Sequence, residues 1–345
     1  MRVVIGVAGT AKNTGKTTTL QAIAAYLRSK GVPVLLTSIG YDGEDVDTIT
    51  ALPKPKMSVE EGDWVATALP FMNTSTAIFK DVRYTGVECA LGPVYLGMAA
   101  SPGRVILAGP ASTFDIERIL GVFPEWCTVL VDGAFSRFSP MSVATHIVFA
   151  TGAARYQDPM LIAAEIRAIS SVMAIPRGFS EGRSLQFPEG LYLDGSDLRF
   201  VEAVESEPHI EVVTAFVCGP INPRILRQAL GMLGKSGRRV KVVVRHPVDL
   251  LLSGNITEWP MVFEESLTHG NLIACQRSSR LLGFTVNPRF PAFDSATGRY
   301  TSILLPQQWF LESIRSASGA DCTDIVFEGP SVLDAWLCEV RAEPV

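Results

Sequence analysis

The pattern of apolar and polar positions in the first 40 residues predicts a strand, a loop, a helix and a second strand. Residues 3–8 form a continuous apolar run of strand length, and residues 17–29 carry apolar side chains at the spacing of one helix face. Gly31 ends that helix, and residues 33–39 form a second apolar run. Strands that are apolar throughout are typical of parallel sheets covered on both faces. The pattern therefore predicts an α/β domain that begins with a parallel sheet.

The same alternation continues to about residue 176. It predicts further strands at 104–108, 128–131 and 146–150, with helices at 112–122 and 159–173. We therefore expect residues 1–176 to form one domain, an α/β fold with a doubly wound parallel sheet.

The alternation of strands and helices is then interrupted. Residues 177–190 are rich in Gly, Ser and Pro and lack periodicity, as a connector would. A second alternation then predicts strands at 191–193, 211–217, 240–244 and 281–286, with helices at 197–204, 223–233 and 307–317. We expect residues 177–345 to form a second, smaller α/β domain that binds a partner or a substrate.

The loop between the first strand and the first helix reads GTAKNTGKTTT and has the residues of a phosphate-binding loop. Such a loop needs backbone N–H groups that converge at a helix N-terminus, a lysine for the outer phosphates and a hydroxyl for magnesium. Gly15, Lys16 and Thr17 meet these needs, although the strict GxxxxGK[ST] pattern would have its first glycine at position 10, where Thr10 stands. A chance GKT in a strand-to-helix turn is the alternative. The expected nucleotide contacts are Thr10, Ala11, Lys12, Asn13, Thr14, Gly15, Lys16, Thr17 and Thr18.

Composition excludes several other classes of protein. Hydrophobic residues make up 47% of the 345 and charged residues 19%, as in globular proteins, and a net charge of -5 argues against nucleic acid as a partner. The six cysteines stand singly, without zinc spacing, which suits a reducing cytoplasm. The chain begins without the features of a signal peptide, and its most apolar stretches are broken by Gly and Pro, so we expect a cytoplasmic protein without a membrane helix.

GTAKNTGKT has the spacing of the loop in dethiobiotin synthetase and its relatives in the SIMIBI class of P-loop NTPases, and the first half of the chain resembles that class. The resemblance implies a magnesium nucleotide at the carboxyl edge of a parallel sheet and, in many members, a homodimer across the nucleotide. Some members place a second lysine in this loop, which reaches the partner's nucleotide. Lys12 lies one residue after that position. The alternatives to a contact with the partner's nucleotide are that Lys12 is solvated or that it contacts phosphate in its own chain.

Two acidic regions are candidates to complete a magnesium site with the Thr17 hydroxyl. Asp132 ends the apolar strand of TVLVDGAF, where the resemblance implies a Walker B acid that holds Mg²⁺, and a turn aspartate before a glycine is the alternative. The run YDGEDVD follows the second strand, where this class carries its first switch. Within that run Asp42 is the candidate catalytic residue, together with Lys16, for orienting water or magnesium, and a solvated DG turn is the alternative.

The expected nucleotide is ATP, because the guanine signature NKxD is absent. Dethiobiotin synthetase carries a lysine directly after its second strand that serves its substrate, and LLTSIGYDG lacks it. The combination of GTAKNTGKTTT, TSIGYDGED and VDGAFSR, followed by a second α/β half, also resembles the accessory ATPase-like subunit that is encoded with adenosylcobalamin-dependent lysine 5,6-aminomutase and is thought to reactivate that enzyme. This second resemblance implies a magnesium-dependent ATPase that remodels a cobalamin-dependent partner enzyme. The alternative is a dethiobiotin-synthetase-like ligase acting on a small carboxylate or amine.

Polar residues also follow two strands of the second half. Arg245, His246 and Asp249 stand in VVVRHPVD, and Asn287 and Arg289 stand in FTVNPRFP. Two interpretations of these residues are open. The HP and NP dipeptides mark the ends of strands, or the residues form a site for an anion or a partner.

Overall fold

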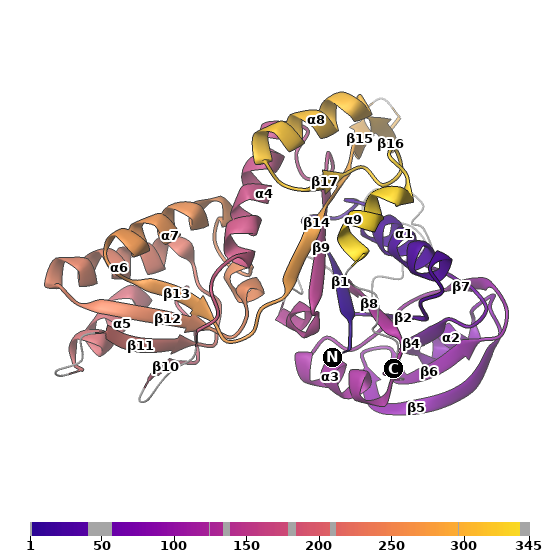
Figure 1. The fold of residues 1–345 in the computed structure, drawn as a ribbon, viewed down its shortest axis with the longest axis horizontal. Coiled ribbons are helices and arrows are strands. Elements are labelled where there is room, and N and C mark those ends of the chain that lie inside the picture. The colour runs from indigo at the N-terminus through magenta and orange to yellow at the C-terminus, as the bar shows by residue number, and fades with distance from the viewer. Residues whose placement is uncertain are drawn as a thin grey trace. The chain divides into compact units, whose positions relative to one another are not determined.

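The protein is described here by a computed structural model that covers residues 2–40, 57–123, 125–133, 139–178, 184–207, 212–295 and 297–338. Its chain forms two compact units (Figure 1). Unit 1 consists of Met1–Ala163 and Leu281–Val345, and unit 2 consists of Ala164–Arg280. Unit 2 is therefore an insertion within the chain of unit 1, and both ends of the described chain belong to the same unit.

A nine-stranded sheet forms the centre of unit 1. Its spatial order is β17 (Cys322–Thr323), β14 (Arg280–Asn287), β9 (His146–Gly152), β1 (Val4–Gly9), β8 (Thr128–Gly133), β2 (Val34–Ser38), β4 (Trp64–Ala68), β6 (Gly92–Ala99) and β5 (Phe79–Cys89). Parallel pairing joins β9, β1, β8, β2 and β4, and also joins β14 to β17. β6 runs antiparallel to both β4 and β5. The expected α/β class is confirmed, but the sheet is mixed rather than wholly parallel.

Burial explains why the parallel strands read as apolar runs. Every residue of β1 and β2 is buried, and α1 (Lys16–Ser29) covers one face of these strands with Leu20, Ile23 and Leu27. At about 25 cal/mol per Å² of apolar surface removed from water, such side chains each contribute on the order of 2 kcal/mol. The helix and the two strands expected within residues 1–40 are confirmed.

The region between β2 and β8 holds most of the elements that the apolar pattern does not predict. Its elements are β3 (Met57–Val59), β4, α2 (Leu69–Asn73), β5, β6, β7 (Gly103–Val105) and α3 (Thr113–Val122). The strand expected at 104–108 is wrong in extent and place, because β7 is short and pairs antiparallel with β3 outside the large sheet. Helix α3 is confirmed, and Ser112 caps it by accepting a hydrogen bond from the backbone N–H of Asp115.

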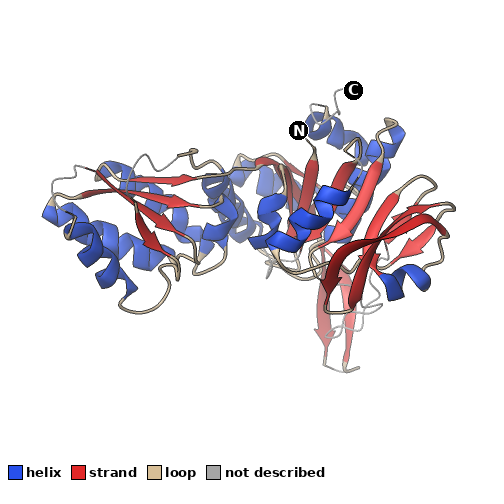
Figure 2. Ribbon diagram, turned by 90° about the horizontal axis from the view of Figure 1, so that it is seen from below, coloured by secondary structure: helices blue, strands red, loops and turns tan. Residues whose placement is uncertain are grey.

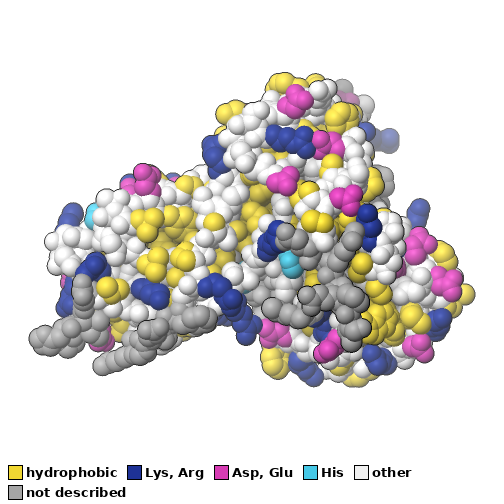
Figure 3. All heavy atoms as spheres, viewed as in Figure 1, with side chains coloured by type: hydrophobic (Ala, Val, Ile, Leu, Met, Phe, Trp, Pro, Cys, Tyr) yellow, Lys and Arg dark blue, Asp and Glu magenta, His cyan; other side chains and the backbone are white. Residues whose placement is uncertain are grey.

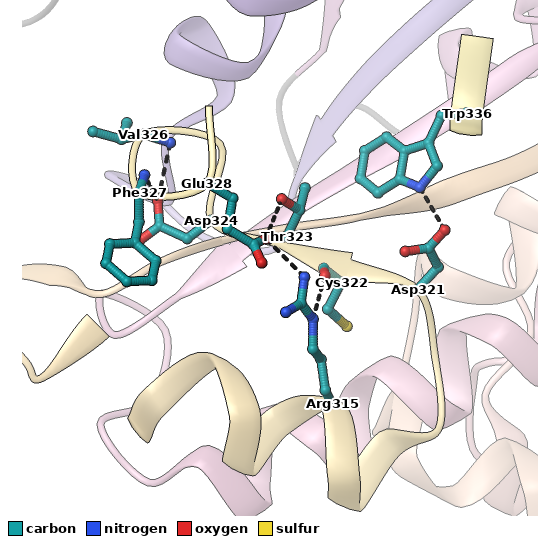
Figure 4. Close-up of polar contacts among 9 residues, drawn as sticks. All are labelled: Arg315, Asp321, Cys322, Thr323, Asp324, Val326, Phe327, Glu328 and Trp336. Atoms are coloured by element: carbon teal, nitrogen blue, oxygen red, sulfur yellow. Dashed lines mark hydrogen bonds and ion pairs between the residues drawn. The ribbon is translucent and has the colours of Figure 1, made fainter. Parts of the chain in front are cut away.

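The chain returns to unit 1 after residue 280, in contrast to the continuous second domain expected at 177–345. β14 enters the large sheet beside β9, and β15 (Arg289–Asp294), β16 (Arg299–Leu304), α8 (Gln307–Ser318), η5 (Pro330–Val332) and α9 (Leu333–Leu337) follow. Near the end of the described chain, Arg315 pairs with Glu328 at 2.7 Å, and the Trp336 indole donates to Asp321 at 2.6 Å (Figure 4). α9 also contacts α1, because the Tyr26 hydroxyl donates to Asp334.

Unit 2 has its own parallel sheet, with the order β10 (Leu185–Phe187), β11 (Val212–Val217), β12 (Arg239–Val244) and β13 (Leu272–Cys275). Its helices include α5 (Ser196–Glu205), α6 (Pro223–Ser236) and α7 (Trp259–Thr268), drawn in blue beside the red strands in Figure 2. The strand expected at 191–193 is wrong, because only an isolated bridge joins Leu191 to Ile221. β10 lies instead within residues 177–190, which the composition indicates to be a connector.

Positive and negative side chains are interspersed on the face drawn in Figure 3. Among the described residues, no helix is both long and apolar enough to cross a membrane.

Helix α4 (Pro159–Met173) extends across the boundary between the two units and carries the chain from unit 1 into unit 2.

Candidate functional site

The glycine-rich loop connects the carboxyl end of β1, at Gly9, to the first residue of α1, Lys16. Gly15 is the residue that precedes the helix, and its φ of 90° places it in the left-handed region that favours glycine. Asn13 is also left-handed, with a φ of 62°, a conformation that asparagine tolerates better than most residues. The loop therefore turns sharply before the helix and brings the backbone N–H groups of the first helical turn to the carboxyl edge of the sheet.

The side chain of Lys16 lies over Gly9. A Cβ atom built on Gly9 would lie 2.6 Å from Cδ and 2.7 Å from Cγ of Lys16, closer than side chains approach. A residue larger than glycine at position 9 would displace the lysine. The glycine one residue before its place in the strict motif thus has a geometric role, since it lets Lys16 fold back toward the loop.

Threonine hydroxyls fasten the loop from within unit 1. Thr10 is buried, its N–H donates to the Ala150 carbonyl at 2.9 Å, and its hydroxyl donates to Thr151 Oγ1 at 2.9 Å. Thr14 is also buried, and its hydroxyl donates to the Ala11 carbonyl at 3.0 Å. Of the predicted nucleotide contacts, Thr10 and Thr14 therefore use their side chains to hold the loop, and their backbone groups remain the candidates for phosphate.

Strand β14 supplies a second support, which sequence reasoning did not assign to the loop. Asn287 donates from Nδ2 to the Asn13 carbonyl at 3.0 Å, and its Oδ1 accepts from the Arg289 N–H at 3.1 Å. Two residues earlier on the same strand, Thr285 shares a hydrogen bond of 2.7 Å with Thr19 of α1. β14 thus contacts both the loop and the helix that follows it, 266 or more residues later in the chain.

The remaining predicted contacts lie on the surface side of the loop and on the first helical turn. Lys12 is exposed, whereas the others are half-buried: Ala11, Asn13, Gly15, Lys16, Thr17 and Thr18. Exposure of Lys12 is compatible with solvation and with a contact to phosphate, so both alternatives stay open.

Asp132 lies on the face of the sheet that α1 covers. It occupies β8 between β1 and β2, in register with Val7 on one side and Ser38 on the other. Paired residues of parallel strands point to the same face, and Val7 belongs to the core cluster that contains Leu20 and Ile23 of α1. The half-buried Asp132 carboxylate therefore shares a face with the start of α1, where Thr17 stands.

Oxygen donors of this kind fit magnesium. Mg²⁺ is usually held by one or two protein oxygen ligands, waters and the phosphates of a nucleotide rather than by an all-protein cage. In the described part of the chain, no cluster of three or more His, Cys, Asp or Glu side chains is arranged to hold a metal ion. The Thr17 hydroxyl and the Asp132 carboxylate are thus the groups that would hold Mg²⁺ beside bound phosphates.

Asp42 and the acidic run that follows β2 lie outside the described residues, so the expected switch stays a prediction. The last described residue before it is Gly40, whose N–H donates to the Pro110 carbonyl at 3.0 Å. The Gly109 N–H in turn donates to the Gly40 carbonyl at 3.0 Å. These two bonds tie the described chain after β2 to residues 109 and 110.

In unit 2 the residues flagged in VVVRHPVD form a buried polar network. The Nδ1 atom of His246 accepts from the Val248 N–H, so Nε2 carries the proton of the neutral ring and donates to Ser279 Oγ at 2.8 Å. Asp249 accepts the backbone N–H of His246 at 3.2 Å and does not bond the imidazole. The three residues are therefore not arranged as a Ser-His-Asp triad, in which the histidine would accept the serine proton.

The environment keeps His246 neutral. Burial, together with the positive charge of Arg277, lowers the pKa of His246 to about 4 from 6.5. Burial also raises the pKa of Asp249, against the opposing charge of Arg245. At neutral pH the histidine therefore serves as an uncharged hydrogen-bonding residue, and a role as general base or metal ligand has no support in its geometry.

A scan against protein-family models finds no match for this chain. A search of the curated proteins likewise finds no significant match.

The bond between Asn287 and the Asn13 carbonyl predicts a positioning role in nucleotide binding. Asn287→Ala should weaken ATP binding by about 0.5–1.5 kcal/mol, roughly 2- to 12-fold, because a hydrogen bond that fixes the loop is lost. Calorimetric titration with Mg-ATP measures the change. Gln308→Ala is the matched control, since it removes an exposed amide that donates to Glu312 of its own helix. Equal affinity in both variants would remove Asn287 from the site.

The depressed pKa of His246 predicts a loss of unit 2 stability in mild acid. The folded-state pKa of about 4 lies below the unfolded value of 6.5, so stability is present above pH 6.5 and is lost as the pH falls toward 4. Between pH 6.5 and pH 5 the loss should be about 2 kcal/mol. Hydrogen exchange of the β12 amides, corrected for intrinsic rates, measures it. The His246→Asn variant should lose less stability between pH 6.5 and pH 5 than the unmodified protein. An equal loss of stability in the two proteins would show that groups other than His246 cause it.

Proposed function

We propose that unit 1 binds ATP with magnesium at the loop between β1 and α1 and hydrolyses it. The observation that carries this proposal is the path of Lys16 over Gly9, at the head of a helix whose N-terminus faces the carboxyl edge of a mostly parallel sheet. Helix N-termini attract anions through their unsatisfied N–H groups and their dipole. A folded-back lysine adds a charge-assisted contact to the outer phosphates.

Each residue of the loop has a distinct part in this proposal. The backbone of residues 11–16 surrounds the phosphates, and the Thr10 and Thr14 hydroxyls keep that backbone in place through the bonds to Thr151 and Ala11. Lys16 balances the charge that develops on the transferred phosphoryl group. Thr17 and Asp132 hold magnesium, which when bound supplies further positive charge to the outer phosphates.

We further propose that nucleotide binding is coupled to a partner enzyme through unit 2. The chain leaves unit 1 after β9 and returns along β14, and these two neighbouring strands are the ones that bond the loop. A change in the loop on hydrolysis would therefore act on both strands that connect to unit 2. The resemblance to the aminomutase-reactivating subunit makes a cobalamin-dependent enzyme the proposed partner.

A ligase acting on a small carboxylate or amine is the second candidate. It is favoured only by the resemblance of the loop to dethiobiotin synthetase, while the lysine that serves the substrate in that enzyme is missing after β2. The remodelling proposal also gives the inserted unit 2 a role, which is to bind the partner enzyme. In a small-molecule ligase, unit 2 would serve only as a substrate site.

Removing Lys16 or the charge of Asp132 should separate binding from hydrolysis. Lys16→Ala should weaken ATP binding by about 1.5–3 kcal/mol, because the charge-assisted contact is lost. Asp132→Asn should keep most of the nucleotide affinity and lose magnesium-dependent hydrolysis. Calorimetry and phosphate release measure the two effects, and Lys30→Ala, at the far end of the same helix, is the control. Wild-type affinity in Lys16→Ala would defeat the proposed site.

The two candidate functions predict different responses to added components. A remodeller should hydrolyse ATP slowly alone and faster with an inactivated cobalamin-dependent aminomutase, and its ATP and ADP forms should differ in affinity for that enzyme by roughly 5- to 150-fold. A ligase should turn over ATP with a metabolite and without a second protein. Steady-state phosphate release with each addition distinguishes them. Stimulation by a small carboxylate or amine alone would overturn the remodelling proposal.

A further inference from the structure

Strands β15 and β16 form an antiparallel hairpin in unit 1, between β14 and α8 (Figure 1). Within the part of the chain that the structure describes, β16 pairs with β15 alone, so its other side is a free edge. Five of the six residues of β16 are exposed, and Tyr300 is half-buried. An edge strand presents backbone N–H and C=O groups that a strand of another chain can pair with. The free edge of β16 is therefore a candidate interaction surface.

The register of the hairpin fixes which backbone groups of β16 lie at this edge. The Leu305 N–H donates to the Pro288 carbonyl at 3.0 Å, so these two residues, which continue the register, form a hydrogen-bonded pair. Hydrogen-bonded and non-hydrogen-bonded pairs alternate along an antiparallel ladder. Residues 299, 301 and 303 therefore direct their backbone groups toward β15. Residues 300, 302 and 304 direct theirs toward the free edge.

Two other strand edges of unit 1 carry features that hinder pairing with another chain. On β15, Pro291 stands opposite Ser302 in a non-hydrogen-bonded pair, so the outer edge of β15 lacks one N–H donor. β5 is the last strand of the large sheet, and its register shifts near Asp81, which is left-handed with a φ of 55°. Arg118 of α3 also donates to the Gly86 carbonyl of β5 at 2.9 Å. Proline, bulges and covering elements are means by which proteins protect their edge strands.

Strand β16 carries none of these protective features. It contains no proline, its register with β15 is continuous, and its only charged residue is Arg299 at its first position. Apolar side chains are exposed on both faces of the hairpin, since Phe293 is 58% exposed on one face and Ile303 is 42% exposed on the other. Phe293 shares its face with Tyr300, and their ring centroids lie 5.2 Å apart. The free edge thus has the composition of a strand that is paired rather than protected.

We propose that the free edge of β16 pairs antiparallel with β16 of a second copy of this chain, about a two-fold axis at Ser302. Residues 300, 302 and 304 of one copy then face residues 304, 302 and 300 of the other, so the N–H groups of these residues meet C=O groups. Tyr300 stands opposite a leucine and Thr301 opposite a β-branched isoleucine, and such cross-strand pairs stabilise sheets.

The complementarity of the edge to itself favours a second copy over an unrelated strand. Arg299, the only charge of β16, stands opposite Leu305 of the second copy, so no like charges face each other in this register. The pairing joins two hairpins into a four-stranded sheet and does not depend on the proposed ATPase. A dimer across the nucleotide, as the class resemblance implies, would instead depend on bound nucleotide.

Paired charge variants at Ser302 test this register. Sedimentation velocity of the full chain without nucleotide, over a range of concentrations, should show an equilibrium between monomer and dimer. Ser302→Lys and Ser302→Glu each place two like charges opposite each other at the axis, so each should weaken the dimer by about fivefold or more. An equimolar mixture of the two variants should dimerise at least as readily as the unmodified chain, because opposite charges then face each other. Ser302 is exposed, so neither variant disturbs the core.

Two further variants complete the test. Ser206→Lys is the matched control, since it adds the same charge at an exposed serine of unit 2 and should leave the dimer unchanged. Ser302→Pro removes an N–H that points away from β15, so it should keep the hairpin and weaken the dimer. A chain that stays monomeric at all concentrations, or a dimer that both charge variants leave unchanged, would overturn the proposal. Dimerisation only with ATP present would also overturn it, in favour of a dimer across the nucleotide.

Discussion

The attachment of one short loop to two neighbouring strands is the constraint on which the account of unit 1 depends. The loop leaves β1 at Gly9 and must reach the first turn of α1 through left-handed residues at Asn13 and Gly15. Such a backbone is costly unless its surroundings fix it. Bonds from Thr10 to the end of β9 and from Asn287 of β14 to the Asn13 carbonyl provide that support. These bonds thus hold the loop backbone in one conformation, as the proposed phosphate site requires.

The attachment of the loop to β9 and β14 also suggests the proposed role of the inserted unit 2. Residues 164–280 are placed in the chain between the two strands that hold the loop. Unit 2 has its own parallel sheet and its own buried polar network, so it has the features of a separate domain. The proposed nucleotide-dependent change at the loop would therefore act on the two strands between which unit 2 is inserted.

The sequence predicted the parts of the site that are local and missed the parts that are not. The apolar runs and the GKT motif predict β1, the loop and α1 because strand, turn and helix signals follow one another within 30 residues. No such signal links Asn287 to Asn13, since NP after a strand is equally well explained by punctuation. The membership of residues 281–338 was missed for the same reason: β14 reads as an ordinary apolar strand, and only pairing beside β9 shows which sheet it completes. The antiparallel strand β5 was missed because most of its residues are exposed and give no apolar run.

The most direct test of the central claim is amide hydrogen exchange of the full chain with and without a non-hydrolysable Mg-ATP analogue. The account predicts that the analogue slows exchange together in two segments far apart in sequence, residues 10–19 and residues 285–287, because Asn287 and Thr285 bond the loop and its helix. Protection of the first segment with no change in the second would contradict the proposed link between the loop and β14. Protection of neither would show that the loop does not bind the nucleotide.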